Sequence, residues 1–165
     1  MRNLRMVTLV LVVLGLSAGP AVGAEPVGVG SDRVTYYLAL GDSLAAGYQP
    51  IGREEDDRKT RMGYADQLWL MARHAYPDLQ LVNLGCPGAN TQTITEIDPR
   101  CQYENGSQLD EALAIIKEHQ QELAFITIDI GFNDFECEDM SCLFPGIDGI
   151  AERLPPILAT LQEAA

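Results

Sequence analysis

Three short polar segments in this sequence each follow an apolar run, and each offers a group that could take part in chemistry at the end of a strand. Gly41-Asp42-Ser43-Leu44 offers a serine hydroxyl, and we expect the Ser43 amide to lie at the N-terminus of a helix, which favours negative charge. Asn83-Leu84-Gly85 offers a glycine amide, and Gly131-Phe132-Asn133-Asp134 offers a carboxamide donor. Such N–H groups stabilise the oxyanion that forms when a hydroxyl attacks a carbonyl. Each segment alone is typical of an ordinary turn, so the interpretation depends on whether the three meet.

The sequence offers no convincing base for such a serine. A hydroxyl becomes a good nucleophile only when a base removes its proton, and that base is usually a histidine. The histidines are His74, just before Pro77, and His119, near the end of a predicted helix. Both fall in elements that should pack beside a sheet, so we interpret them as helix-surface residues and expect no general base in this chain.

The elements that precede the three segments must position them. Runs of β-branched, aromatic and aliphatic residues predict three buried strands, at residues 34–40, 79–84 and 123–130. Apolar residues at helical spacing predict three helices, at 64–76, from a Ser107 cap onward, and at 147–165. The Pro155-Pro156 pair should kink or interrupt the last helix. This alternation predicts an α/β fold with a parallel sheet and helices on both faces, whose strand ends would bring Ser43, Gly85 and Asn133 to one edge.

The order and placement of these motifs resemble the SGNH (GDSL) hydrolases, from about Thr35 to the end of the chain. Segment 36–48 is particularly similar to secreted actinobacterial members. The resemblance implies a three-layer, flavodoxin-like domain that hydrolyses carboxylic esters, as an esterase or lipase, through an acyl-serine and without a cofactor. It implies a nucleophile at Ser43 and an oxyanion hole formed by the Ser43 amide, the Gly85 amide and the Asn133 side chain. The supporting residues would be Gly41, Asp42, Gly131 and Asp134, with Asp42 holding the turn rather than acting as the triad acid.

In the family that this sequence resembles, the base lies in an Asp-x-x-His motif near the C-terminus, which the sequence lacks. We therefore expect a hydrolase domain at 34–165 that is incomplete at its C-terminus, with the last strands missing and strand 123–130 at an unprotected edge. A fragment and a natural truncation both remain open. The expected function is that of an esterase-family protein inactive alone, and the alternative is a non-catalytic acyl- or glycan-binding protein that uses the same cleft.

The N-terminus predicts export. Residues 1–24 combine Arg2 and Arg5 with a short apolar stretch and small residues before position 25, the pattern of a signal peptide. The stretch is shorter than the roughly 20 residues that span a bilayer, so we expect a secreted protein without stable membrane insertion. A glycine-rich, flexible segment at 25–33 follows.

Four cysteines predict disulfides in a secreted chain: Cys86, Cys101, Cys137 and Cys142. Three connectivities are possible, and sequence proximity favours Cys86–Cys101 and Cys137–Cys142. No Cys-x-x-Cys pair occurs and no histidine lies near, so a zinc site is not expected.

Charge and the remaining motifs limit the partners. A net charge of −13 argues against binding to nucleic acid, which leaves a small-molecule or lipid ester as the expected substrate. Residues 49–61 include seven consecutive charged side chains and predict a solvated loop. The acidic residues at 129, 134, 136, 138 and 139 match no EF-hand, so no metal is expected. No Walker loop or Rossmann fingerprint indicates a cofactor, and nothing indicates the oligomeric state.

Overall fold

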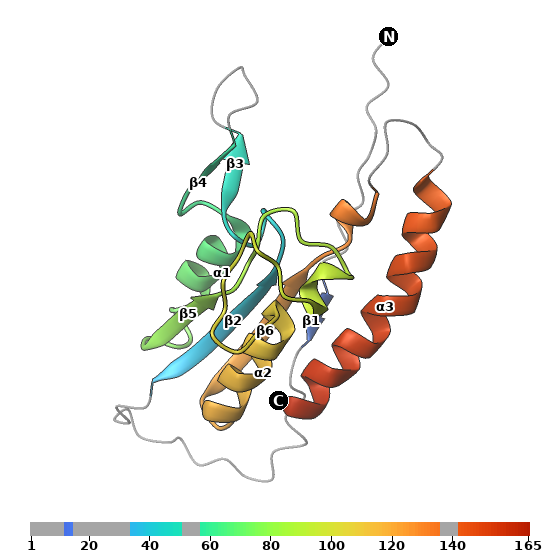
Figure 1. The fold of residues 1–165 in the computed structure, drawn as a ribbon. Helices are drawn as coiled ribbons and strands as arrows, with labels where there is room; N and C mark the ends of the chain where they lie inside the picture. The colour runs from blue at the N-terminus through green and yellow to red at the C-terminus, as the bar shows by residue number, and fades with distance from the viewer. Residues whose placement is uncertain (1–11, 15–33, 51–56, 136–141) are drawn as a thin grey trace.

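The computed structural model of the chain describes residues 12–14, 34–50, 57–135 and 142–165. Its centre is a sheet with the strand order β1-β6-β2-β5 (Figure 1). The central strand β2 (Thr35–Gly41) lies parallel to β5 (Leu79–Asn83) on one side and to β6 (Leu123–Asp129) on the other. This parallel sheet confirms the α/β, flavodoxin-like fold that the sequence predicted.

Helices cover both faces of the sheet. Those of the described residues are α1 (Tyr64–Ala72), α2 (Gln108–Glu118) and α3 (Leu143–Ala164). Successive side chains of a strand point to opposite faces, so β2 contributes to two cores. Tyr37 and Ala39 pack on the α1 side, whereas Leu38 and Leu40 pack with residues of α2 and α3. The result is the three-layer arrangement that the sequence predicted.

The start of α2 is fixed both to its own first turn and to the end of β2. The Ser107 hydroxyl accepts the Asp110 amide at 3.1 Å, and the Asp110 carboxylate accepts the Ser107 amide at 3.0 Å, so the predicted cap is confirmed. Hydrogen bonds from the Ser107 hydroxyl and then from the Ser107 amide lower the pKa of the Asp110 carboxyl, because they favour its charged form. The buried Gln108 side chain accepts the Gly41 amide at 2.8 Å and donates to the Gly41 carbonyl at 3.0 Å. α2 therefore holds the strand end that leads to Ser43.

Helix α3 is longer than predicted and continuous. It begins at Leu143 rather than at residue 147, and it runs through Pro155 and Pro156. Each proline removes a backbone donor, yet the buried side chains of Ile157 and Leu161 hold the following turns in the core. The predicted interruption is therefore wrong, because tertiary packing outweighs the local preference. Neither α3 nor another helix of the described residues is long and apolar enough to cross a membrane.

Two short pairings differ from the predictions. β3 (Tyr48–Pro50) and β4 (Asp57–Lys59) form an antiparallel pair at the two ends of the segment predicted as a loop, while residues 51–56 lie outside the described residues. β1 (Val12–Leu14) pairs antiparallel with β6. β6 thus lies between two strands rather than at the edge that the sequence predicted. β1 falls within the predicted signal peptide, which stays a prediction.

Candidate active site

Ser43 lies in a tight turn at the carboxyl end of β2. Gly41 has a φ of 134°, and a Cβ there would lie 2.1 Å from the Asp129 carbonyl oxygen, so only glycine fits where β2 passes β6. The Tyr48 amide donates to the Ser43 carbonyl at 2.8 Å and turns the chain into β3. The sequence predicted a helix N-terminus at Ser43. The structure has a turn instead, so no helix dipole acts on this hydroxyl.

Asp42 links the Ser43 turn to the segment after β6. Its side chain is buried, with 1% of the residue exposed. The Oδ1 atom accepts the Leu44 amide at 2.8 Å, and Oδ2 accepts the Asn133 Nδ2 at 3.3 Å. Burial raises the pKa of Asp42, and the bond from the Leu44 amide opposes that rise. The carboxylate thus braces the turn from within and contacts a residue 91 positions later.

The Gly85 backbone packs directly on the same turn. A Cβ at this position would lie 2.4 Å from the Ala46 nitrogen. The Asn83 side chain fixes the contact: its Nδ2 donates to the Ala45 carbonyl at 2.7 Å, and its Oδ1 accepts the Gly85 amide at 2.9 Å. Sequence reasoning missed this role of Asn83, although an asparagine two residues before a glycine is a recognisable Asx-turn signal.

Asn133 lies in the short helix η2 (Phe132–Asp134), which follows Gly131 with a φ of 121°. Its Nδ2 donates to the Asp42 Oδ2 at 3.3 Å and to the Ala89 carbonyl at 2.8 Å. A carboxamide nitrogen carries two hydrogens, so both are engaged. The longer bond, to Asp42, is the weaker of the two.

The structure brings the three proposed oxyanion donors together around one turn. Gly85 contacts it at Ala46, and Asn133 contacts it at Asp42, directly beside Ser43. This convergence follows from the topology, because the parallel strands β5, β2 and β6 end at one edge of the sheet. The Gly85 amide and the Asn133 carboxamide both donate hydrogen bonds to acceptors within the protein. An oxyanion could bind to either group only by replacing one of those acceptors.

Asp134 anchors η2 through a network that the sequence did not reveal. Its side chain is 1% exposed. The carboxylate accepts the Thr91 amide at 2.9 Å, the Thr91 hydroxyl, and the Arg153 Nη2 at 3.0 Å. Arg153 also donates from Nε to the Thr91 hydroxyl at 2.9 Å. Helix α3 is thereby tied to the residue that follows Asn133, through contacts that no local sequence pattern indicates.

A second buried carboxylate, Asp129, ends β6. The residue is 5% exposed, and its Oδ2 has no hydrogen-bond partner among the described residues. Burial, and then the nearby Asp42 carboxylate, raise the pKa of Asp129 to about 6. The Thr127 hydroxyl lies 2.8 Å from the Tyr37 hydroxyl and 3.4 Å from that of Tyr64. Burial raises the pKa of Tyr37 to about 12 and also raises that of Tyr64, so both tyrosines stay protonated.

The histidines lie near the N-terminal ends of the parallel strands, whereas Ser43 lies at their C-terminal ends. The His119 ring stacks on Tyr36, near the start of β2, with the ring centres 3.9 Å apart, and its Nδ1 lies 3.1 Å from the Glu122 Oε2. His74 lies in the turn after the C-terminal end of α1, and this end of α1 contacts the start of β5. Within the described residues, no hydrogen bond to the Ser43 hydroxyl occurs. Neither histidine is thus adjacent to the Ser43 turn.

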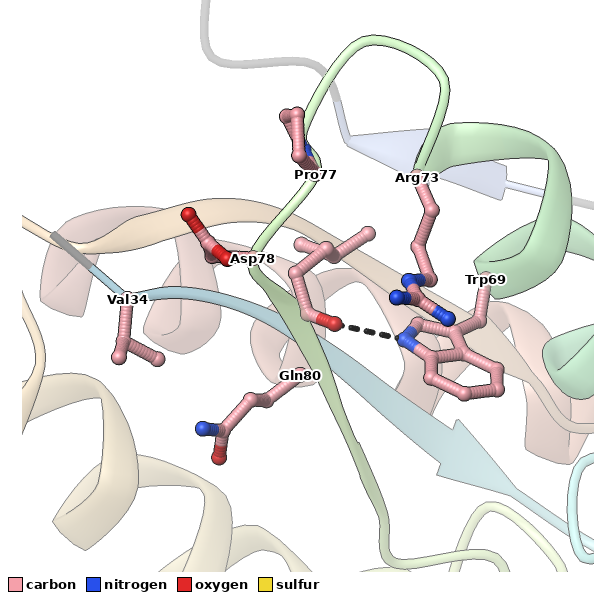
Figure 2. A pocket seen from close by; sticks show the side chains of 7 residues that line it. Val34, Trp69, Arg73, Pro77, Asp78 and Gln80 are labelled. Carbon is pink, nitrogen blue, oxygen red and sulfur yellow. Dashed lines mark hydrogen bonds between the residues drawn. The ribbon is translucent and has the colours of Figure 1, made fainter. Parts of the chain in front are cut away.

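A cavity of about 410 Å³ also lies near the N-terminal ends of the strands, between the starts of β2 and β5 (Figure 2). The Arg73 guanidinium carbon lies 5.1 Å from the centre of the Trp69 ring, whose Nε1 donates to the Leu79 carbonyl at 2.8 Å. The first contact lies within α1 and its C-cap, and the second joins α1 to β5. Because Ser43 follows the opposite end of β2, this cavity is not part of the candidate active site.

The acidic residues do not gather into a metal centre within the described parts of the chain. No group of three or more His, Cys, Asp or Glu side chains there could hold a metal ion. Asp134 is engaged by Thr91 and Arg153, while Asp129 lies beside Asp42. The other acidic residues considered, at 136, 138 and 139, lie outside the described residues.

A disulfide fixes the segment that follows Gly85. Cys86 and Cys101 are bonded at 2.06 Å, so this predicted pair is confirmed. The Cys86 amide also donates to the Gly41 carbonyl at 2.9 Å, which ties the bridge to the end of β2. Cys142 is disulfide-bonded as well, and its predicted partner, Cys137, lies outside the described residues.

One comparison with known proteins gives a match. The family model described as GDSL-like Lipase/Acylhydrolase matches residues 37–162. The matched range begins in β2, ends in α3 and contains Ser43, Gly85 and Asn133. No curated protein and no solved structure matches the chain.

Proposed function

Because the chain belongs to the GDSL-like lipase/acylhydrolase family, we propose that it carries the nucleophile and the oxyanion-binding groups of a carboxylic ester hydrolase. Ser43 is the proposed nucleophile. The Ser43 amide, the Gly85 amide and the Asn133 Nδ2 are the proposed oxyanion donors. The observation that carries the proposal is the 3.3 Å contact between Asn133 and Asp42, because it joins two distant segments beside the nucleophile.

The proposed reaction proceeds in two steps. The Ser43 Oγ loses its proton to a base and bonds to the ester carbonyl carbon, and the carbonyl oxygen takes the negative charge. The C–O bond to the alcohol then breaks, the alcohol leaves with a proton, and an acyl-serine remains. Water releases the acid by the same route. Each donor aimed at the oxyanion contributes about 3–4 kcal/mol of transition-state stabilisation in comparable sites.

Exposed apolar side chains beside the proposed catalytic residues support an ester with an apolar acyl group. Leu44, next to Ser43, is 40% exposed, and Phe132, next to Asn133, is 67% exposed. An acyl chain that covered these side chains would remove apolar surface from water, which contributes about 25 cal/mol per Å². We therefore favour esters of medium-chain acids over acetyl esters as substrates.

The positions of His74 and His119 support low turnover by the 165-residue chain alone. A hydroxyl without a base reacts slowly. We propose that Ser43 is acylated measurably only when a base is supplied, and added imidazole can serve as one. The alternative, a non-catalytic binding protein that uses the same cleft, is favoured by the absence of a hydrogen bond to the Ser43 hydroxyl among the described residues.

The test is acylation of Ser43 by p-nitrophenyl butyrate with and without imidazole, followed by mass spectrometry of the peptide that contains Ser43. We expect butyrylation that rises with imidazole and disappears in Ser43→Ala. Asn133→Ala should slow it by about 100-fold or more, as the loss of one oxyanion donor does elsewhere. Binding of butyrate esters without acylation, at any imidazole concentration, would favour the binding protein and contradict our proposal.

Export is proposed as well. The Cys86–Cys101 disulfide supports an oxidising compartment, because such bonds rarely persist in the cytosol. Secretion of the full chain and the N-terminal residue of the secreted form can be determined by expression and Edman sequencing. We expect the secreted form to begin at Glu25.

A further inference from the structure

The carboxylate of Asp129 is a buried group that the proposed reaction leaves without a role. Its Oδ2 is the buried side-chain atom without a hydrogen-bond partner among the described residues. A buried polar group without a partner costs free energy, so its presence calls for an explanation. Asp129 also pairs with Gly41 in the β2–β6 register, and its carbonyl accepts the Asp42 amide at 3.1 Å. It therefore lies one residue from the Ser43 turn.

The groups around Asp129 leave its charge uncompensated. Asp42, directly after β2, and Tyr64, in the first turn of α1, both interact with it electrostatically. Thr127 of β6 and Tyr37 of β2 complete the polar layer on this face of the sheet. The ion pairs between described residues include neither Asp42 nor Asp129. Asp42 and Asp129 are thus two buried carboxylates on residues joined by a backbone hydrogen bond, and their negative charges repel each other.

Asp42 is the member of this pair that holds the site. Its two oxygens accept the Leu44 amide and the Asn133 carboxamide. Both bonds require a negative Asp42 at full strength, because charged acceptors form the stronger hydrogen bonds. Any group that perturbs the Asp42 charge therefore changes its hydrogen bonds to Leu44, which follows the proposed nucleophile, and to Asn133, a proposed oxyanion donor.

We propose that Asp129 is a positioning residue that holds a proton at mildly acidic pH and thereby strengthens the grip of Asp42 on Leu44 and Asn133. The proton comes from solvent and binds the unpartnered carboxylate, which removes the repulsion on Asp42. When Asp129 is ionised, the two negative charges repel each other, and the hydrogen bonds that Asp42 accepts from Leu44 and Asn133 weaken. The charge of Asp129 would thus make the candidate active site pH-dependent. Its effect on catalysis rests on the proposed function of that site.

The physical properties of Asp129 place this change in a useful pH range. An ordinary aspartate is ionised well below pH 5, whereas burial and Asp42 raise the pKa of Asp129 to about 6. Tyr64 keeps its hydrogen throughout, because burial raises its pKa further. The charge of Asp129 thus changes between pH 5 and 7.

NMR titration of the full chain between pH 4.5 and 8 tests the proposal. The probes are the Asp129 carboxyl carbon, the Leu44 backbone amide and the Asn133 side-chain NH₂. We expect all three to shift with one midpoint near 6. In Asp129→Asn the Leu44 and Asn133 shifts should lose that transition and stay near their low-pH values, while Asp78→Asn, an exposed site at the other edge of the sheet, should leave it intact.

Two results would overturn the proposal. One is an Asp129 carboxyl that titrates near 4, and the other is an unchanged Leu44 and Asn133 transition in Asp129→Asn. If that variant does not fold, Asp129→Ser replaces it, and the wild-type carboxyl titration needs no variant. The readout requires no turnover, so failure of Ser43 acylation and failure of this coupling are separate results.

Discussion

Replacement of Arg153 by methionine tests the network that ties α3 to the candidate site. The change removes the 3.0 Å bond to Asp134 and the 2.9 Å bond to Thr91, and it keeps most of the apolar stem. Asp134 is 1% exposed and keeps its bonds from Thr91, whereas the Arg153 side chain is 37% exposed. Breaking a fully buried pair costs about 3–5 kcal/mol. Because water can reach the vacated guanidinium position, we expect the lower figure of about 2–3 kcal/mol.

Urea denaturation followed by circular dichroism measures this loss of stability. In thermal unfolding, we expect the midpoint to fall by roughly 6–12 °C. The control is Arg73→Met, which removes an arginine that stacks on Trp69 at the other edge of the sheet and should cost about 1 kcal/mol or less. Asp134→Asn, combined with Arg153→Met in a double-mutant cycle, should show a coupling of about 1 kcal/mol or more. Equal stability of the two Arg→Met variants, or additive effects in the cycle, would refute the buried network.

The remaining predictions concern the strand ends. Replacing Cys86 and Cys101 together by serine should lower the free energy of unfolding by about 3 kcal/mol, since the bridge spans 15 residues; urea curves compared with and without reductant check it. Gly85→Ala should cost about 1–3 kcal/mol, because its Cβ would lie 2.4 Å from the Ala46 nitrogen; a thermal midpoint like the wild type would contradict this close packing. The native state holds the proton of Asp129 up to a pKa of about 6, against 3.8 in the unfolded chain. Its contribution to stability is therefore complete below about pH 4 and is lost as the pH rises through 6, by about 3 kcal/mol. Asp129→Asn should flatten that slope in urea titrations between pH 4 and 7.

The sheet and the convergence at its edge could be predicted because they depend on local patterns. The continuous run of apolar residues from Tyr36 to Leu40 identifies a strand buried on both faces. Parallel strands then end at one edge, which brings Ser43 and Asn133 close without any further information. Ser107 could be recognised as a cap because capping depends on residues three apart.

The errors arose where distant contacts decide the conformation. Pro155 and Pro156 lie inside a continuous helix, because Ile157 and Leu161 are buried in the core shared with α2. The hydrogen bonds of Arg153 reach 62 positions back to Thr91, a separation that no periodicity reports. The chain after Ser43 forms a turn rather than a helix for a similar reason. The backbones of Gly63 and Gly85, from other parts of the chain, pack closely against that turn.

In the proposed oxyanion hole, the hydrogen bonds of Asn133 determine which contacts a substrate must displace. Both hydrogens of its Nδ2 already have acceptors, the Ala89 carbonyl at 2.8 Å and Asp42 at 3.3 Å. An ester carbonyl is a weak acceptor and gains little by displacing either, whereas an oxyanion is a charged acceptor and forms a bond roughly twice as strong. The exchange therefore favours the tetrahedral intermediate over the bound ester, which is the condition for raising the rate of reaction. The longer bond, to Asp42, is the one that we expect to break. Asp42 would then lose the Asn133 hydrogen bond as the oxyanion forms. Under our proposal, the charge of Asp129 sets the strength of that bond and therefore the free energy needed to break it.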